Sequence, residues 1–269
     1  MKKKYKYAAI ILVYRNDKDL EECIKSFYEH IEDCKIVIVN AFYDEESKNK
    51  IKDIANVYNC DFINEINKGY SYGNNKGIEY IKENYDYDYV IISNPDIIIK
   101  EFNGNFMSGG IIAPKIICAS GKNQNPMMIK ECKLANYFVY RGFKSNINLF
   151  FMIGIGLEKL KNKFYSILYK NKNNIKIFAA HGSFVVISRN VTEFIDPLYD
   201  ENIFLFAEEG VLAYKAQNKG IYTNYNDNIV VHHKEDGSMK LADFSINNEL
   251  KKANIYFYEN YVRNNSKRG

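Results

Sequence analysis

Apolar residues follow two alternating patterns along the first hundred positions. Apolar runs at residues 8–13, 35–39 and 89–92 predict strands buried on both faces of a sheet, and residues 60–64 predict a further short strand. The intervening segments carry apolar residues at helical spacing and predict helices that begin near Asn16 or Asp17, near Ser47 and at Gly73. This order is typical of an α/β fold with a Rossmann-like, mostly parallel central sheet flanked by helices.

The run at 89–92 leads into an Asn-Pro-Asp sequence. Pro95 cannot donate to a strand ladder, so the strand is expected to stop there and to leave Asn94 and Asp96 at its carboxyl end. Ligands of open α/β sheets bind beyond such ends, where a carboxylate can hold a divalent cation that neutralises a diphosphate. Taken alone, the three residues fit a plain tight turn better.

The later part of the chain predicts further strands at residues 109–117, 184–187 and 229–231. An apolar run at 203–207, which we also take as a strand, leads into two acids and then a helix that ends near Gly220. Residues 244–262 have a helical apolar face, whereas the periodicity between 118 and 180 is poor. That middle segment is either a helical cover over the sheet, which we favour, or a basic, aromatic surface resting on an anionic membrane.

Composition narrows the class of protein. The 269 residues can bury the core of one large domain or of two fused halves, and 46% apolar and 26% charged residues are ordinary for a soluble globular protein. The net charge of +4 is too small and dispersed to predict nucleic-acid binding. Five cysteines without CxxC spacing predict reduced thiols in a cytosolic protein. Without a signal-peptide or membrane-span pattern, the chain is expected to be soluble or at most peripheral to a membrane.

Three further groups of residues could carry chemistry. Residues 67–77 are rich in Gly and Asn at a strand-to-helix junction, which can bind an anion, although a plain turn is the simpler interpretation. Glu208 and Glu209 either begin a helix or supply a general base for a sugar hydroxyl. His232 and His233 are either structural or, if one of them lies near Asp96, part of a metal site.

Six motifs in sequence order resemble the inverting family 2 glycosyltransferases of the GT-A fold, in particular their bacterial rhamnosyltransferase-like branch. The matching segments are residues 11–16, 67–77, 93–96, 181–184, 202–209 and 233–238. The resemblance covers about residues 7–117 and 181–240, and no family pattern matches residues 118–180. It implies a nucleotide-sugar-binding half at 1–117 and a mixed acceptor-binding half at 118–269, with a variable middle segment and a helical tail, fused in one domain.

The resemblance also implies roles for single residues. Asp96 and His233 would hold Mg²⁺ or Mn²⁺ against the diphosphate of the donor, and His232 is the alternative if the register shifts by one. Glu209 would be the general base, supported by Glu208. The remaining implied residues line the donor site: Tyr14, Asn16, Asn40, Lys68, Gly69, Asn74 and Asn94.

The implied reaction moves a sugar from a nucleotide sugar to a hydroxyl of a surface glycan or lipid-linked saccharide. It would proceed in one inverting displacement in the cytoplasm, at most at the inner face of the plasma membrane. Two positions depart from the family pattern, since Asn40 stands where Asp is usual and Val211 where an acid is usual. The alternatives are a nucleotidyltransferase on a similar sheet and a non-catalytic relative that binds nucleotide or glycan.

Overall fold

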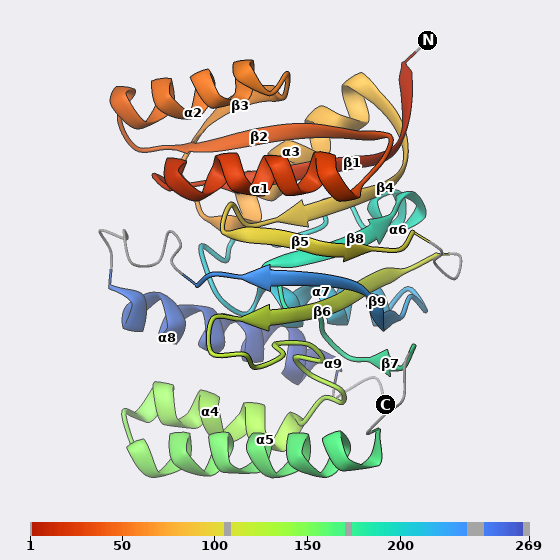
Figure 1. Ribbon diagram of the computed structural model, residues 1–269. Coiled ribbons are helices and arrows are strands. Elements are labelled where there is room, and N and C mark those ends of the chain that lie inside the picture. Colours follow the sequence, from red (N-terminus) through yellow and green to blue (C-terminus); the bar gives the residue numbers. More distant parts are fainter. Residues whose placement is uncertain (1, 105–108, 170–173, 236–244, 266–269) are drawn as a thin grey trace.

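The structure is a computed structural model that describes residues 2–104, 109–169, 174–235 and 245–265. Its centre is a nine-stranded sheet in which eight strands follow the order β3-β2-β1-β4-β8-β6-β9-β5 and β7 pairs with β9 (Figure 1). The strands are β1 (Lys3–Val13), β2 (Cys34–Phe42), β3 (Asp61–Ile66), β4 (Tyr85–Ser93), β5 (Ile97–Phe102), β6 (Ile111–Cys118), β7 (Lys176–Ile177), β8 (Phe184–Ser188) and β9 (Thr223–His233).

The helices lie between and after these strands. They are α1 (Asp17–His30), α2 (Glu45–Val57), α3 (Tyr70–Asn84), α4 (Lys133–Ser145), α5 (Asn148–Leu168), α6 (Arg189–Phe194), α7 (Glu208–Gln217), α8 (Ile246–Phe257), the π-helix η2 (Tyr258–Val262) and α9 (Arg263–Asn265). Within the described ranges, no helix is both long enough and apolar enough to cross a membrane.

Strand direction divides the sheet into a parallel part and a mixed part. Strands β1 to β4 are mutually parallel where they pair, whereas β8 is antiparallel to both of its neighbours, β4 and β6. Strand β9 runs parallel to β6 and antiparallel to β5. Because β8 is inserted between β4 and β6, strands from both sides of residue 117 interleave in one sheet.

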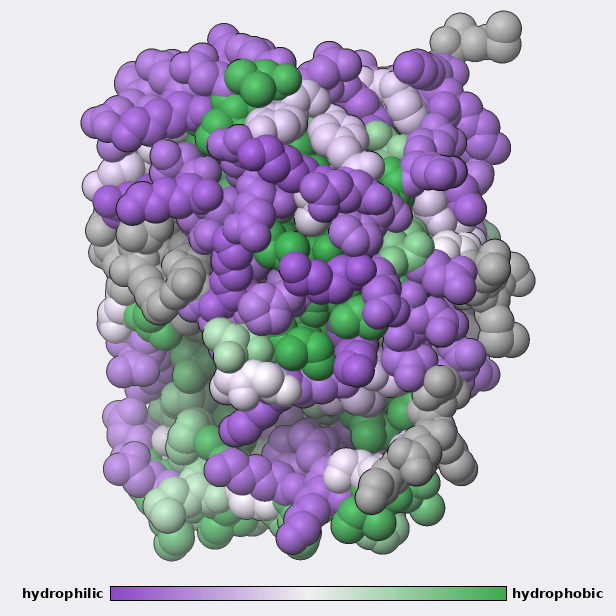
Figure 2. Space-filling view, viewed as in Figure 1, coloured by the Kyte–Doolittle hydropathy of each residue, from purple (hydrophilic) through white to green (hydrophobic). Residues whose placement is uncertain are grey.

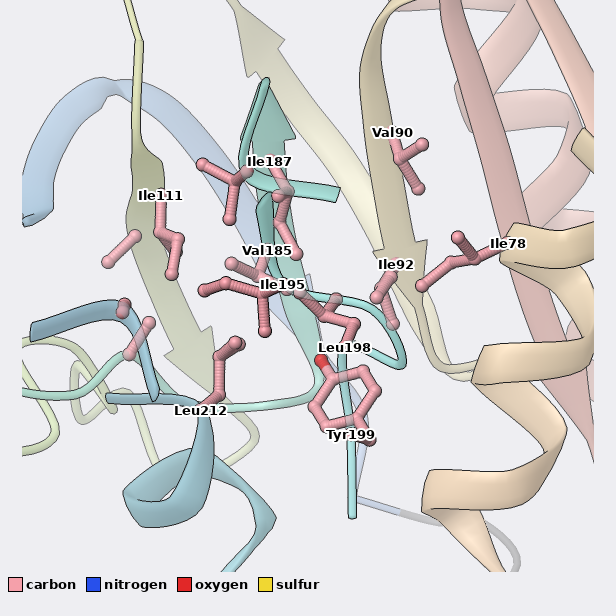
Figure 3. Close-up of a cluster of buried hydrophobic side chains, with 14 of the residues drawn as sticks. Ile78, Val90, Ile92, Ile111, Val185, Ile187, Ile195, Leu198, Tyr199 and Leu212 are labelled. Atoms are coloured by element: carbon pink, nitrogen blue, oxygen red, sulfur yellow. The ribbon is translucent and has the colours of Figure 1, made fainter. Parts of the chain in front are cut away.

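Each face of the sheet buries its own apolar cluster. On one face, α1 and α2 pack against β1 and β2 through Leu20, Phe27 and Ile51, which are fully buried. On the other face, Ile78 of α3 and Leu212 of α7 belong to the cluster that covers β4 and β8, as Figure 3 shows. The helix that begins with the two glutamates is therefore fixed to the sheet by its own apolar face.

Several predicted boundaries differ from the structure. The third helix begins at Tyr70 and not at Gly73, so most of the Gly- and Asn-rich run is helical. Residues 203–207 form no strand, because Phe206 and Ala207 adopt positive φ angles and the segment turns into α7. Strand β5 was not predicted, although it starts directly after Asp96, and Asp44 rather than Ser47 caps α2, since its side chain accepts from the Ser47 N–H.

The middle segment contains a helical hairpin formed by α4 and α5. Helix α4 packs on α8 and η2, so the hairpin covers that helical layer, and Tyr165 and Tyr169 reach the apolar cluster of the sheet (Figure 1). The middle segment is therefore largely helical, but it covers the helices α8 and η2 more than the sheet itself. Residues 236–238 of the last motif, residues 170–173 and the start of the predicted tail at 244 lie outside the described residues.

Candidate active site

Asp96 and His233 lie side by side at the carboxyl ends of β4 and β9. Asp96 is 3% exposed, and its Oδ2 lies 3.4 Å from Nε2 of His233. The pairing of β5 with β9 places Ile97 opposite His233, which brings the residue after Pro95 to the end of β9. Because side chains alternate along a strand, the neighbouring His232 points to the opposite face.

Gln124 sets the orientation of the His233 ring. Its Nε2 donates to Oε1 of Glu235 at 3.0 Å, so its Oε1 must face Nδ1 of His233, 2.8 Å away. An amide oxygen can only accept, and Nδ1 therefore carries a proton. In the neutral ring, the lone pair of Nε2 is then directed at the carboxylate of Asp96.

This arrangement fits a cation. A neutral Nε2 and a carboxylate oxygen are both acceptors, so they can share this short separation only around a proton or a metal ion. The second oxygen of Asp96, Oδ1, is buried and has no hydrogen-bond partner among the described residues. No group of three or more His, Cys, Asp and Glu side chains in the described part of the chain could hold a metal. Two protein ligands suffice for Mg²⁺ or Mn²⁺ when substrate phosphates and water complete the shell.

Glu208 and Glu209 form the first turn of α7. Ala207 precedes them with φ +64°, which reverses the chain so that both side chains start at the helix N-terminus, where negative charge is favoured. Oε1 of Glu209 accepts from the backbone N–H of Gly182 at 3.2 Å. Glu208 is buried, and its Oε2 finds no partner among the described residues.

The environments of the two acids differ. Burial, followed by the negative charge of Glu209, raises the pKa of Glu208 well above that of an ordinary glutamate. The half-buried Tyr70 and the buried Tyr199 lie edge to face with ring centroids 5.6 Å apart, and the charges of both acids act on each of them. A buried carboxyl group that holds its proton beside a second carboxylate is a feature of sites that carry out acid–base chemistry.

His181 connects the acids with the Asp96–His233 pair. Its ring centroid lies 5.8 Å from that of His233, and it adjoins Gly182, whose N–H binds Glu209. Burial lowers the pKa of His181, against the opposing effect of the Glu209 charge. Its Nδ1 accepts from the backbone N–H of Ser183 at 3.2 Å, so the neutral ring carries its proton on Nε2.

Two observations locate the space available to substrates. A cavity of about 10 Å³ beside Glu209 and His181 has room for one water-sized molecule only, so a sugar must bind outside it. The carboxyl ends of β1, β2 and β4 lie on the same edge of the sheet as Asp96, because these strands are parallel. The open edge formed by these strand ends is therefore the candidate donor site.

The residues expected to contact the nucleotide base stand at the ends of β1 and β2. Tyr14 meets the ring of Tyr43 edge-on at 5.9 Å, and the Arg15 guanidinium lies 3.9 Å from the centroid of that ring. Asn40 is fully buried, and its Nδ2 donates to Oδ1 of Asn64 at 2.6 Å. Asn16 is also buried, and its Nδ2 donates to the carboxylate of Asp19 at 2.9 Å.

The other expected donor-site residues cluster around the start of α3. Gly69 packs against the backbone of Phe204, and Lys68 is exposed with its ammonium 5.0 Å from the Tyr72 ring centroid. Asn74 is buried, and its Nδ2 donates to the Tyr70 carbonyl at 3.0 Å. The backbone N–H of the half-buried Asn94 donates to the Ser183 carbonyl at 2.9 Å, which joins the end of β4 to the start of β8.

Sequence reasoning did not assign a role to His181 or Gln124. His181 belongs to a motif that was noticed, and a polar residue directly before a buried strand was the available signal. Gln124 lies in the segment without a recognisable pattern, so only the fold shows its contact with His233. Val211, at the position where the resemblance led us to expect an acid, is fully buried where α7 packs on α8.

Comparisons with known proteins agree with this architecture. No protein-family model matches the chain. The low-salt glycan biosynthesis hexosyltransferase Agl10 of Haloferax volcanii is 28% identical over 221 residues, which cover 79% of this chain and 62% of that protein. The chain thus spans less than two thirds of that relative's length.

Two solved structures share the fold at low sequence identity. GalNAc-T7 with UDP, GalNAc and Mn²⁺ superposes with a TM-score of 0.55 at 14% identity over 86% of this chain and 44% of that one. The mannosyltransferase PcManGT of Pyrobaculum calidifontis with GDP-Man and Mn²⁺ gives 0.53 at 12% identity over 94% and 70%. The chain is therefore glycosyltransferase-like, and the expected GT-A fold is confirmed.

Proposed function

We propose that this glycosyltransferase-like chain transfers a sugar from a nucleotide-diphospho-sugar to a hydroxyl group of a saccharide or lipid-linked acceptor. The observation that carries the proposal is that Asp96, His233, His181 and Glu209 are neighbours, with Glu209 joined to the segment of His181 through the Gly182 N–H. A metal-side pair and a carboxylate base at one edge of the sheet are what this reaction needs. Either Mg²⁺ or Mn²⁺ would fit the oxygen and nitrogen donors of this pair.

The donor would bind across the carboxyl ends of the first strands, in the half formed by residues 1–117. Tyr14, with Tyr43 and Arg15 beside it, offers a flat aromatic surface for the base. Asn16 and Asn40, at the ends of β1 and β2, would line the floor of this site. Asn94, Asn74, Gly69 and Lys68 would flank the sugar and diphosphate, and residues 118–269 would bind the acceptor.

Asp96 and His233 would hold the divalent cation. When bound, the cation would neutralise charge on the diphosphate that leaves. Gln124 keeps the His233 ring in the tautomer whose Nε2 can coordinate. The unpartnered Oδ1 of Asp96 leaves a second carboxylate oxygen available at the same place.

Glu209 would act as the general base. As the acceptor oxygen bonds to the anomeric carbon, its proton passes to a carboxylate oxygen of Glu209, and the bond from carbon to the diphosphate oxygen breaks. Glu208, which its raised pKa keeps protonated, adds no second negative charge beside the base. A single displacement of this kind inverts the anomeric carbon.

The test is donor hydrolysis, in which water replaces the acceptor. UDP-, dTDP- and GDP-sugars are screened with Mg²⁺ and Mn²⁺, and the first anomer released is read by NMR. Glu209→Gln should lower the rate by about 10²–10⁴-fold without loss of donor binding. Glu101→Gln, at an exposed position of β5, is the control. Full activity in Glu209→Gln would show that Glu209 is not the general base. Release of the retained anomer would exclude the single displacement.

A further inference from the structure

An apolar stripe runs along the outer face of α5. It contains Leu149, Met152, Leu160, Phe164 and Ile167, which are 61 to 68% exposed. With the exposed Gly156, their spacing of three and four residues keeps all of them on one face over the length of the helix. Exposed apolar patches of this extent mark interaction sites rather than ordinary surface.

The opposite face of α5 is occupied by the rest of the protein. Gly154 is buried against Val139 and Ala135 of α4, which brings the two helices into close contact. Helix α4 in turn packs on α8 and η2, where Tyr140 stacks on Tyr258 with ring centroids 4.4 Å apart. The stripe is thus the outward face of a supported helix, and Figure 2 shows hydrophobic surface at this end of the molecule.

The charge around the stripe is positive. Helices α4 and α5 together contain six Lys and Arg residues and one acid, Glu158. Glu158 forms an ion pair with Lys161 at 2.5 Å, away from the exposed face. Lys159 and Lys163 are exposed beside Leu160 and Phe164, and no described residue forms a hydrogen bond or ion pair with either ammonium group.

The combination of an apolar stripe with exposed lysines shows which kind of partner the outer face of α5 fits. A second copy of the chain that docked through the same face would bring Lys159 and Lys163 of both copies into one interface without an acid among the described residues of that face to pair with them, and like charges repel. An anionic bilayer instead takes apolar side chains into its interface and attracts the lysines to its headgroups. We propose that the outer face of α5 docks on an anionic lipid membrane, with the helix lying in the plane of the surface.

The position of the α4–α5 hairpin determines how the candidate active site would be oriented on a membrane. The turn between α4 and α5 lies on the same side of the molecule as the carboxyl ends of β4 and β9 (Figure 1). With the outer face of α5 on a membrane, the edge of the sheet that carries Asp96 and His233 would face sideways, along the membrane surface, on the side of the α4–α5 turn. The docking itself depends on α5 alone and does not require the proposed reaction.

The experiment is co-sedimentation of the full chain with vesicles of phosphatidylglycerol and phosphatidylcholine in equal parts, and with vesicles of phosphatidylcholine alone. We expect binding to the anionic vesicles that weakens with added salt, and at least about tenfold weaker binding to the neutral vesicles. Leu160→Ser with Phe164→Ser, and separately Lys159→Glu with Lys163→Glu, should each reduce anionic binding by about tenfold or more.

Matched controls come from the opposite end of the sheet. Val57→Ser on α2, at a residue that is 76% exposed, and Lys52→Glu on the same helix should leave vesicle binding unchanged. Circular dichroism of each variant checks that the helices are retained. Absence of binding to anionic vesicles at low salt, or equal binding by the α5 variants, would overturn the proposal. A dimer in sedimentation velocity that the same α5 substitutions dissociate would also overturn it and assign the stripe to a second copy.

Discussion

Nε2 of His233 lies 3.4 Å from Oδ2 of Asp96, and neither atom has a proton to donate when the imidazole is neutral. The contact is therefore attractive only when a positive charge is shared between the two groups. Gln124 leaves Nε2 without a proton in the neutral ring, because its amide oxygen accepts a hydrogen bond from the ring proton on Nδ1. In the proposed function this pair holds the cation, and the orientation of its imidazole depends on Gln124.

Gln124→Leu should weaken metal activation. Without the amide oxygen, the His233 ring is free to rotate or to change tautomer, and loss of such an orienting contact typically costs about 10–100-fold in metal affinity. The measurement is the Mn²⁺ concentration that gives half-maximal donor hydrolysis, with the rate at saturating Mn²⁺ largely restored. Gln217→Leu, at the exposed end of α7, is the control. An unchanged Mn²⁺ dependence would show that Gln124 does not position the ring.

His181→Phe should lower turnover while the fold is kept. Ser183 holds the neutral imidazole with its proton on Nε2, so the wild-type ring can donate to a substrate oxygen beside Glu209 and His233. Phenylalanine keeps the ring volume and removes the donor, and we expect about a 10–100-fold loss of kcat. His232→Phe on the opposite face of β9 should retain activity. Equal rates in both variants would exclude a role for the His181 proton.

Glu208→Gln should change how stability depends on pH. The pKa of this buried carboxyl is raised from 4.5 to about 8, so the folded chain binds the proton more tightly than the unfolded chain. The stability that the proton supplies is complete below about pH 4.5 and is lost as the pH rises toward 8.

Urea unfolding between pH 5 and pH 8 measures this effect. The wild-type free energy of unfolding should fall relative to Glu208→Gln by roughly 2–4 kcal/mol over this interval. The glutamine variant contains every other titrating group of the wild-type protein and is therefore the reference for the wild-type pH profile. Parallel profiles for the two proteins would show that Glu208 ionises in the folded state as freely as in the unfolded chain.

The strands β1, β2 and β4 could be predicted from the sequence, because each is buried on both faces of the sheet and therefore contains a continuous run of apolar residues. The same rule failed at residues 203–207, where Ile203 is buried against α7 and α8 without any strand pairing. The proximity of Asp96 and His233 follows from two strand ends at one edge of a sheet. The contact of Gln124 with His233 depends on the β6–β9 register, which aligns Cys118 with His233 and which no local pattern encodes.

Gly69→Ala should destabilise the chain and reduce activity together. Gly69 has φ +97° and ψ 179°, a region open essentially to glycine alone, and an added Cβ would lie 2.1 Å from the carbonyl oxygen of Phe204. That carbonyl accepts from the Tyr70 N–H at 2.8 Å, so the clash pushes the start of α3 away from the segment leading to Glu208. We expect a loss of about 2–4 kcal/mol in urea unfolding. Gly121→Ala, with φ +78° and open space around it, should cost only about 1 kcal/mol. Equal losses would mean that backbone strain alone, and not the contact with Phe204, makes glycine necessary at position 69.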